Sequence, residues 1–200
     1  NDVALAERFA AALAAELAAV GVSLDFAPVL DVLTTSRNPA IGDRALSGDA
    51  EVTARLGAAI IKGLQDGGVA ACGKHFPGHG DTTVDSHLDL PVVEHPPERL
   101  REVEFVPFRA AIEARVAGLM TAHLLVPSLD GERPATVSRR IVGLLRDELG
   151  FDGVVFTDDL DMKGLSSSYP LDRALVAAIA AGCDVGLSCG KDIGAHARAL

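Results

Sequence analysis

Residues 69–91, VAACGKHFPGHGDTTVDSHLDLP, decide the fold class of this chain. The segment begins as a short apolar run and then becomes a loop rich in glycine, histidine and aspartate. Pro77, Gly78 and Gly80 exclude a regular helix through the middle of the loop. An apolar run of this kind is typical of a strand buried on both faces of a parallel sheet, so we expect a strand that ends in a long polar loop.

The same pattern of an apolar strand followed by a helix recurs along the chain. We predict strands that start near residues 24, 69, 118, 153 and 184, the first of them within the run SLDFAPVLDV at 23–32. Apolar residues at helical spacing predict helices over 3–20, 50–66, 107–115, 138–149 and 171–181. Regular alternation of strand and helix predicts an α/β domain with a parallel sheet.

The polar residues at the strand ends distinguish a barrel from an open sheet. Asp31, the pair Lys74 and His75, His123 and Asp158 lie at the carboxyl ends of four successive predicted strands. Barrel sites collect residues from the carboxyl ends of many strands, whereas an open sheet binds its ligand at one switch point. No GxGxxG motif follows a strand. We therefore predict a (β/α)8 TIM-type barrel.

A complete barrel has eight strands, and the chain of 200 residues shows five. We interpret residues 1–200 as an incomplete portion of one barrel domain, about strands 3 to 7. Two or more strands are expected before residue 1 and at least one after residue 200.

Charge and composition exclude several classes of partner. The net charge of −10 argues against nucleic acid and against an anionic membrane surface. No run of 18 apolar residues is present, so we expect no membrane insertion. Cys72, Cys183 and Cys189 fit no zinc motif and are predicted to be buried free thiols. Free thiols are compatible with a cytoplasmic protein, and we predict that location while leaving export open.

Residues 73–91 concentrate three histidines, three aspartates and one lysine in 19 positions. One interpretation is a solvated loop with Asx turns. Another is a metal site made by His75, His79, Asp81 and His87, but these residues do not share a helix face, and we predict no metal. The density of titratable groups favours a site for proton transfer.

Five ordered motifs give a specific resemblance. FAPVLDV, IGDRALSGD, KHFPGHGDTTVDSH, MTAHLLVPSLD and PATVSRRIVGLLRDELGFDGVVFTDDLDM follow one another in this order, and the resemblance extends over about residues 3–190. Together they resemble the bacterial β-N-acetylglucosaminidase branch of glycoside hydrolase family 3. The resemblance implies a retaining enzyme that needs no cofactor.

The resemblance also implies the catalytic residues. The aspartate after Thr157, Asp158, corresponds to the nucleophile, with Asp159 and Asp161 as rivals. Strand alternation places Asp158 and Asp159 on opposite faces, so only one should face the barrel mouth. The acid/base is implied to be His87 with Asp85, where the carboxylate would orient the imidazole.

Substrate-binding residues follow from the same resemblance. Lys74, His75 and Arg44 match positions that bind the sugar hydroxyls, for which lysine and arginine supply donors. Asp31 and His123 also lie at strand ends and are expected to support the site without contacting the substrate. The family also uses an Asp and an Arg in a segment resembling DQEGGRVxR, which this chain does not contain.

The sequence thus predicts an enzyme whose partner is a small saccharide. The expected reaction is hydrolysis of terminal, non-reducing β-linked N-acetylglucosamine, with peptidoglycan fragments as substrate. A phosphorylase of the same family remains open, because a histidine acid/base does not repel phosphate as a carboxylate does. A β-glucosidase of the same family and a non-catalytic sugar-binding protein also remain open.

Overall fold

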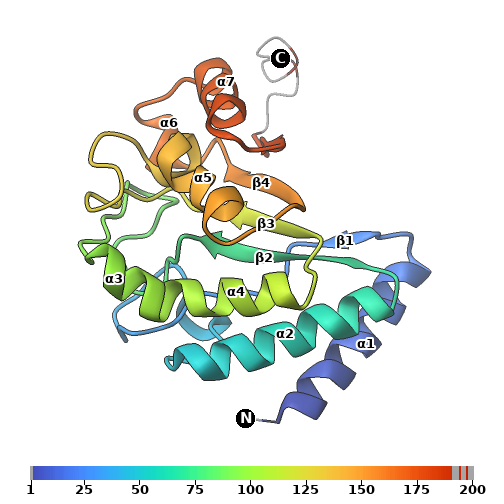
Figure 1. The fold of residues 1–200 in the computed structure, drawn as a ribbon. Helices are drawn as coiled ribbons and strands as arrows, with labels where there is room; N and C mark the ends of the chain where they lie inside the picture. Colours follow the sequence, from blue (N-terminus) through green and yellow to red (C-terminus); the bar gives the residue numbers. More distant parts are fainter. Residues whose placement is uncertain (1, 191–193, 195–196, 198–200) are drawn as a thin grey trace.

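The computed structural model describes residues 2–190, 194 and 197 and shows a parallel sheet covered by helices (Figure 1). The strands are β1 Leu24–Asp25, β2 Ala70–Phe76, β3 Gly118–Thr121, β4 Val154–Asp159 and β5 Val185–Leu187. The longer helices are α1 Val3–Ala19, α2 Ala50–Asp66, α4 Phe105–Glu113, α5 Arg139–Asp147 and α7 Leu171–Ala181. Shorter helical segments are η1 Gly42–Arg44, α3 Pro97–Arg99, η2 Leu100–Glu104, η3 Ala135–Val137 and α6 Lys163–Ser166.

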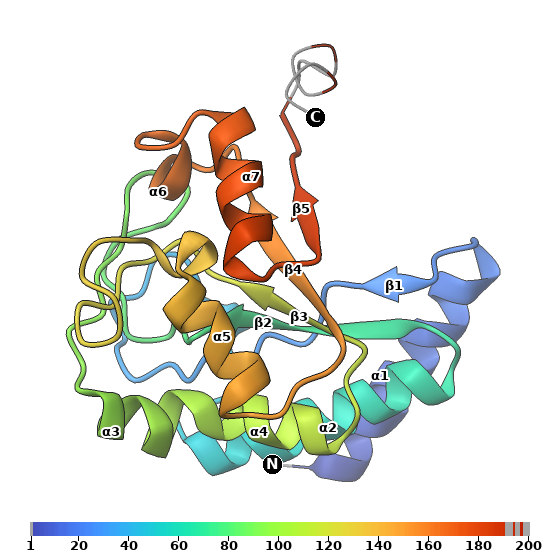
Figure 2. The ribbon, with the colours of Figure 1, turned by 45° about the horizontal axis from the view of Figure 1, so that its top comes forward.

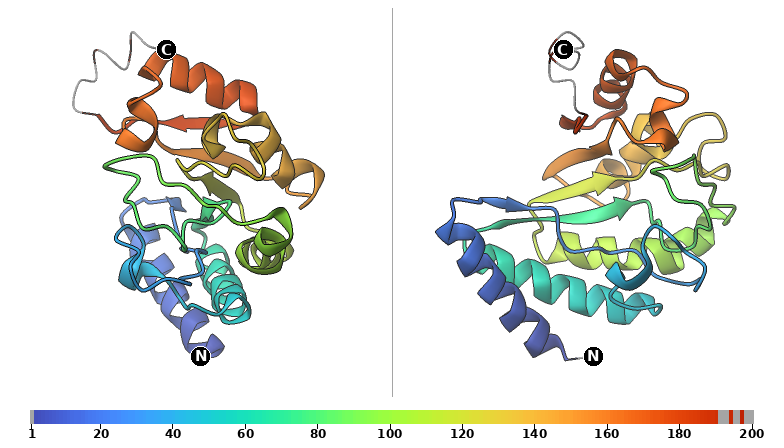
Figure 3. Two further views of the ribbon diagram at one scale, coloured as in Figure 1. Left: turned by 90° about the vertical axis from the view of Figure 1, so that its left-hand side faces the viewer. Right: turned by 180° about the vertical axis from the view of Figure 1, so that it is seen from behind.

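The spatial order of the strands equals their order in the chain. The sheet runs β1-β2-β3-β4-β5, and every neighbouring pair is parallel. A doubly wound sheet would reverse this order at a switch point, and none of the described strands does so. The helices follow one another along one side of the curved sheet, which Figure 3 shows from two directions. The predicted barrel architecture, in the form of a portion of a barrel, is therefore confirmed.

The core lies between the sheet and its helices. Phe76 at the end of β2 meets Phe105 and Phe108 of α4, with ring centroids 5.3 and 5.2 Å apart. Leu119 of β3 and Val155 of β4 are fully buried as well. Burial against the helices accounts for part of the apolar character of the strands, whereas Val154 and Val185 at the starts of β4 and β5 are 39% and 36% exposed.

Two helix boundaries show the residues that set them. The Ser138 side chain accepts a hydrogen bond from the backbone N–H of Ile141 and so caps α5, as its position before the helix predicted. Helix α7 ends at Gly182, whose φ of 116° suits glycine. These two ends agree with the predicted helices to within two residues.

Two elements differ from the sequence prediction. Helical structure begins at Pro97, well before the predicted start at Pro107, and passes through the π-turn η2 into α4. Pro107 has no backbone N–H to donate to the preceding turn, and that turn is the π-turn η2. The run over 23–32 forms only a short β1, because Pro28 interrupts it before Val29 bridges to Lys74.

The thiol prediction is correct for two of the three cysteines. Cys72 and Cys183 are buried, and burial raises the pKa of each thiol to about 12. Cys189 is exposed, because it follows β5 in a connection that leaves the core. Within the described part of the chain, no helix combines the length and the apolar character that a membrane span requires.

Candidate active site

The connections after β2, β3 and β4 meet at one end of the sheet, on the left in Figures 1 and 2. The connection after β2, residues 77–96, is the polar loop rich in glycine, histidine and aspartate. Parallel strands bring their carboxyl ends to one edge, so residues distant in sequence become neighbours there. The candidate site is built at this edge.

Asp31 is the buried centre of the site. Its side chain is fully buried, and its two carboxylate oxygens accept from the ring Nδ1 of His75 at 2.6 Å and from the backbone N–H of His79 at 2.6 Å. Burial raises the pKa of Asp31, but the charges and hydrogen bonds of His75 and His79 outweigh burial and hold it below its ordinary value. An ionised Asp31 therefore holds His75 at the end of β2 and His79 in the loop that follows.

His79 fastens the first half of the polar loop. Its Nδ1 lies 2.7 Å from Thr82 Oγ1, and its Nε2 lies 3.0 Å from Ser86 Oγ. Its backbone carbonyl accepts from the side chain of Asn38. Next to it, a Cβ on Gly80 would overlap the carbonyl group of Val32, so only glycine fits there. The loop is thus packed and hydrogen-bonded, in contrast to the solvated loop that was one interpretation of its composition.

Asp85 and His87 form the predicted pair. Asp85 Oδ1 accepts from His87 Nδ1 at 2.8 Å and from the His87 backbone N–H at 2.9 Å. Partial burial raises the pKa of Asp85, but these two hydrogen bonds and the charge of His87 outweigh it and hold the pKa below its ordinary value. The His87 side chain is 63% exposed. Asp85 occupies Nδ1, so Nε2 is the nitrogen that remains available to a reacting oxygen.

The three aspartates at the end of β4 have different partners. Asp159 Oδ1 accepts from the backbone N–H groups of Asp161 and Cys189, which gives it a role in shaping the loop. Asp161 Oδ2 accepts from Ser188 Oγ and from the backbone of Gly190. The described hydrogen bonds of the Asp158 side chain are limited to the backbone N–H of Asp159 beside it. Asp158 therefore differs from Asp159 and Asp161, because its described side-chain hydrogen bonds do not extend beyond the neighbouring residue.

His123 at the end of β3 supports the Asp158 segment. Its Nε2 donates to the backbone carbonyl of Asp159 at 2.9 Å, and its Nδ1 lies 2.8 Å from Thr136 Oγ1. Burial lowers the pKa of His123 below its ordinary value, and the charge of Asp158 opposes that shift only in part. A neutral His123 with its proton on Nε2 holds the last peptide of β4 in place, which agrees with the supporting role expected for it.

The remaining predicted residues do not all join this network. Lys74 is half-buried beside His75 on β2, and its positive charge acts on the Cys72 thiol. Arg44 lies in η1 with an exposed side chain, and its guanidinium donates to the carbonyl of Ala40. The described contacts do not bring Arg44 to Lys74, His75 or Asp158.

The four residues considered for a metal have separate partners. His75 contacts Asp31, His79 contacts two hydroxyls, Asp81 pairs with His95 at 2.6 Å, and His87 contacts Asp85. Among the described residues, no three or more His, Cys, Asp or Glu side chains converge as metal ligands would. His79 and His87 thus have partners within the loop, whereas His75 in β2 contacts Asp31 of another segment.

Sequence reasoning missed the residues that hold the loop together. Ser86, Thr82 and Asn38 are buried, and each makes a side-chain contact within this network. Small polar residues in a glycine-rich loop are usually solvated, so composition gives no signal for them. The only hint was the position of Ser86 between Asp85 and His87.

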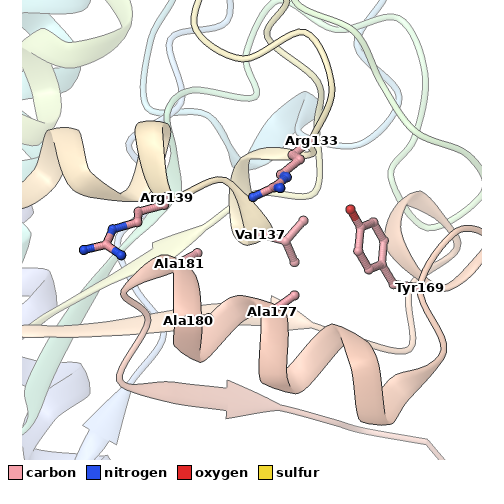
Figure 4. Close-up of a pocket in the computed structure, with 7 residues that line it drawn as sticks. All are labelled: Arg133, Val137, Arg139, Tyr169, Ala177, Ala180 and Ala181. Atoms are coloured by element: carbon pink, nitrogen blue, oxygen red, sulfur yellow. The ribbon is translucent and has the colours of Figure 1, made fainter.

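A cavity of about 440 Å³ lies elsewhere, against α7 and the segment before α5 (Figure 4). It is lined by Arg133, Val137, Arg139, Tyr169 and three alanines of α7. None of the six predicted site residues borders it. The candidate active site is therefore defined by the strand ends and not by this cavity.

Comparisons with known proteins agree with this architecture. Residues 1–199 match the family described as the glycosyl hydrolase family 3 N-terminal domain. The chain is 46% identical over 178 residues to a β-hexosaminidase of Thiobacillus denitrificans and 45% identical over 190 residues to one of Pseudomonas aeruginosa. These alignments cover 88% and 94% of this chain but 49% and 56% of those proteins, so the chain spans about half their length.

Solved structures show the same similarity. The structure of a glycoside hydrolase family 3 β-N-acetylglucosaminidase from Paenibacillus superposes with a TM-score of 0.95 at 46% identity, covering 100% of this chain and 39% of that one. A β-N-acetylhexosaminidase from Beutenbergia cavernae gives a TM-score of 0.92 at 33% identity, covering 100% of this chain and 61% of that one. The family match over nearly the whole chain, together with this fold, shows that the chain belongs to glycoside hydrolase family 3.

Proposed function

We propose that the protein to which this chain belongs is a retaining exo-β-N-acetylglucosaminidase, with Asp158 as nucleophile and His87, paired with Asp85, as acid/base. The observation that carries the proposal is the arrangement of hydrogen bonds at the carboxyl edge of the sheet. Asp159 and Asp161 are engaged in shaping the loop, whereas Asp158 makes no described side-chain contact beyond its own strand end. The nearby loop presents a histidine already oriented by a carboxylate.

The chemistry proceeds in two displacements. The Asp158 carboxylate attacks the anomeric carbon while the glycosidic C–O bond breaks, and His87 Nε2 gives its proton to the departing oxygen. His87 then takes a proton from water as the water oxygen attacks the same carbon and releases the Asp158 carboxylate. Asp85 keeps the imidazole in the required orientation in both steps, as an aspartate does in a catalytic triad.

Lys74, His75 and Arg44 are proposed to bind the hydroxyls of the sugar. His75 is supported by the buried Asp31, which leaves its Nε2 for a ligand. Arg44 lies on a short helical segment outside the main network, and its described hydrogen bond to Ala40 uses one of the five N–H donors of the guanidinium. This part of the proposal is tested by Arg44→Ala, which should raise KM more than it lowers kcat.

The substrate is proposed to be a terminal, non-reducing β-linked N-acetylglucosamine residue, probed best with peptidoglycan fragments. The names of the β-hexosaminidases and β-N-acetylglucosaminidases that this chain resembles support the sugar but not the fragment. A cytoplasmic location remains part of the proposal, supported by the three free thiols. The strands needed to close the barrel are proposed to lie outside this chain.

Covalent trapping tests the mechanism. A 2-deoxy-2-fluoro glycoside with a good leaving group should accumulate a glycosyl-enzyme in the complete protein, and peptide mapping should place the label on Asp158. A label on Asp159 would contradict the assignment. No label together with saccharide binding would indicate a sugar-binding protein in place of an enzyme.

Product analysis separates hydrolysis from phosphorolysis. With phosphate present, a hydrolase yields free N-acetylglucosamine, whereas a phosphorylase yields the sugar 1-phosphate. We expect the free sugar with and without phosphate. A preference for glucosides over N-acetylglucosaminides would instead support a β-glucosidase.

A further inference from the structure

Ser86 lies between the two members of the proposed acid/base pair, yet it faces the opposite way. Ser86 is 3% exposed, whereas its neighbour His87 has a side chain that is 63% exposed. The chain therefore turns at this point so that the dyad faces outward while the residue between its members is inserted into the protein.

Two contacts from different elements hold Ser86. Its Oγ lies 3.0 Å from His79 Nε2, in the first part of the same loop. Its backbone carbonyl accepts from the N–H of Gly164 at 2.8 Å. Gly164 is in α6, which begins only four residues after β4, the strand that carries Asp158. A single residue thus connects the loop of the dyad with the connection that follows the proposed nucleophile.

Either neutral tautomer of the His79 ring can form the hydrogen bond with Ser86 Oγ. When the Thr82 hydroxyl donates to the His79 carbonyl, Thr82 Oγ1 accepts from His79 Nδ1–H. Burial lowers the pKa of His79, which keeps the ring neutral. A neutral ring with its proton on Nδ1 has an unprotonated Nε2, which accepts the hydroxyl proton of Ser86. His79 is itself held by Asp31 through its backbone N–H at 2.6 Å.

The approach of α6 to this segment is close. A Cβ on Gly164 would come within 2.9 Å of the Ser86 carbonyl oxygen and 3.1 Å of the Asp89 carbonyl oxygen. The segment that carries His87 is therefore packed directly on α6. Beyond it, Val92 bridges to Leu125, so the exposed residues 87–89 lie between two fixed points.

We propose that Ser86 is a positioning residue that sets the Asp85–His87 dyad relative to the strand bearing Asp158, through its hydroxyl to His79 and its carbonyl to Gly164. The inference rests on the proposed function, and it adds a residue that the chemistry itself does not use. Proton transfer depends steeply on distance, so a small displacement of His87 lowers general acid help without touching the nucleophile.

The test uses Ser86→Ala in the complete protein, with Thr83→Ala as the matched control. Both variants delete one hydroxyl from the same loop, but Thr83 is exposed and has no hydrogen-bond partner among the described contacts. Ser86→Ala should lower kcat/KM for a β-linked N-acetylglucosamine disaccharide by roughly 10- to 100-fold. Cleavage of a nitrophenyl glycoside, whose leaving group needs little protonation, should fall much less. Thr83→Ala should leave both substrates unaffected.

Hydrogen exchange gives a readout that needs no catalysis. The backbone N–H groups of His87, Leu88 and Asp89 all donate to Asp85 and should be protected. Ser86→Ala should speed their exchange by roughly 2- to 10-fold, the effect of one lost hydrogen bond. If the wild-type protein cleaves neither substrate, the proposed function fails. Faster exchange in Ser86→Ala would still show that Ser86 holds residues 87–89 in place. Unchanged exchange, or equal losses on both substrates, overturns the inference.

Discussion

At the scale of single residues, the site separates groups that react from groups that orient them. His87 is exposed and oriented by Asp85. Its removal should therefore have the largest effect on protonation of the departing glycosidic oxygen. His87→Ala should slow cleavage of natural saccharides on the order of 100- to 10,000-fold and slow activated aryl glycosides far less. Steady-state kinetics with both substrates measure this. Equal losses would mean that another group is the acid.

The pairing of Asp85 with His87 also predicts how the rate losses of their single variants combine. Asp85→Ala leaves the imidazole in place but removes its orientation, so the loss should be milder than for His87→Ala. The double variant should be no slower than His87→Ala alone, because the two residues act as one unit. Additive losses in this cycle would contradict the pairing seen between Asp85 Oδ1 and His87 Nδ1.

At the scale of elements, the loop after β2 depends on a close approach to residue 32. Gly80 packs against the Val32 backbone, where a Cβ does not fit. Gly80→Ala should lower the free energy of unfolding by about 1–3 kcal/mol, as overpacking does, and should reduce turnover. Gly131→Ala is the control, since its Cβ would meet nothing closer than 3.7 Å. Urea unfolding of both variants checks this, and equal stability of the two would argue against a rigid loop.

At the scale of the whole molecule, buried neutral histidines make stability depend on pH. Burial lowers the pKa of His79 and His123 in the folded protein, while an unfolded histidine titrates near pH 6.5. Below about pH 6.5 the unfolded state binds protons that the folded state does not, so stability falls as pH falls. Each histidine adds up to about 1.4 kcal/mol per pH unit to that slope.

Unfolding measured between pH 5 and 8 tests this dependence. His123→Gln keeps a donor for the Asp159 carbonyl but cannot titrate, so the slope below pH 6.5 should become shallower by that amount. An unchanged slope would mean that His123 binds its proton over the same pH range in the folded protein as in the unfolded one. Asp31 acts at lower pH: its lowered pKa gives stability above about pH 4 that is lost in stronger acid.

The sequence alone determined the periodic features of this protein. Apolar runs and helix caps such as Ser138 act over a few residues, so the starts of the five strands and the ends of most of the main helices could be predicted, whereas the run over 23–32 forms only the short β1. Polar residues at strand ends pointed to the barrel edge and to Asp31 and His123, and family resemblance supplied roles for Asp158, His87 and Asp85. The helical turns over 97–104 and the exposure of Cys189 were missed, because neither depends on local periodicity.

Only the tertiary structure decided how the site is held. The contact of Ser86 with His79 joins residues within an irregular loop, and its contact with Gly164 joins positions 78 residues apart in the chain. The hydrogen bonds that the Asp159 side chain accepts from Asp161 and Cys189 likewise distinguish it from Asp158. Hydrogen bonds between irregular segments depend on where the packed strands place their ends. Local sequence patterns contain no signal for that placement.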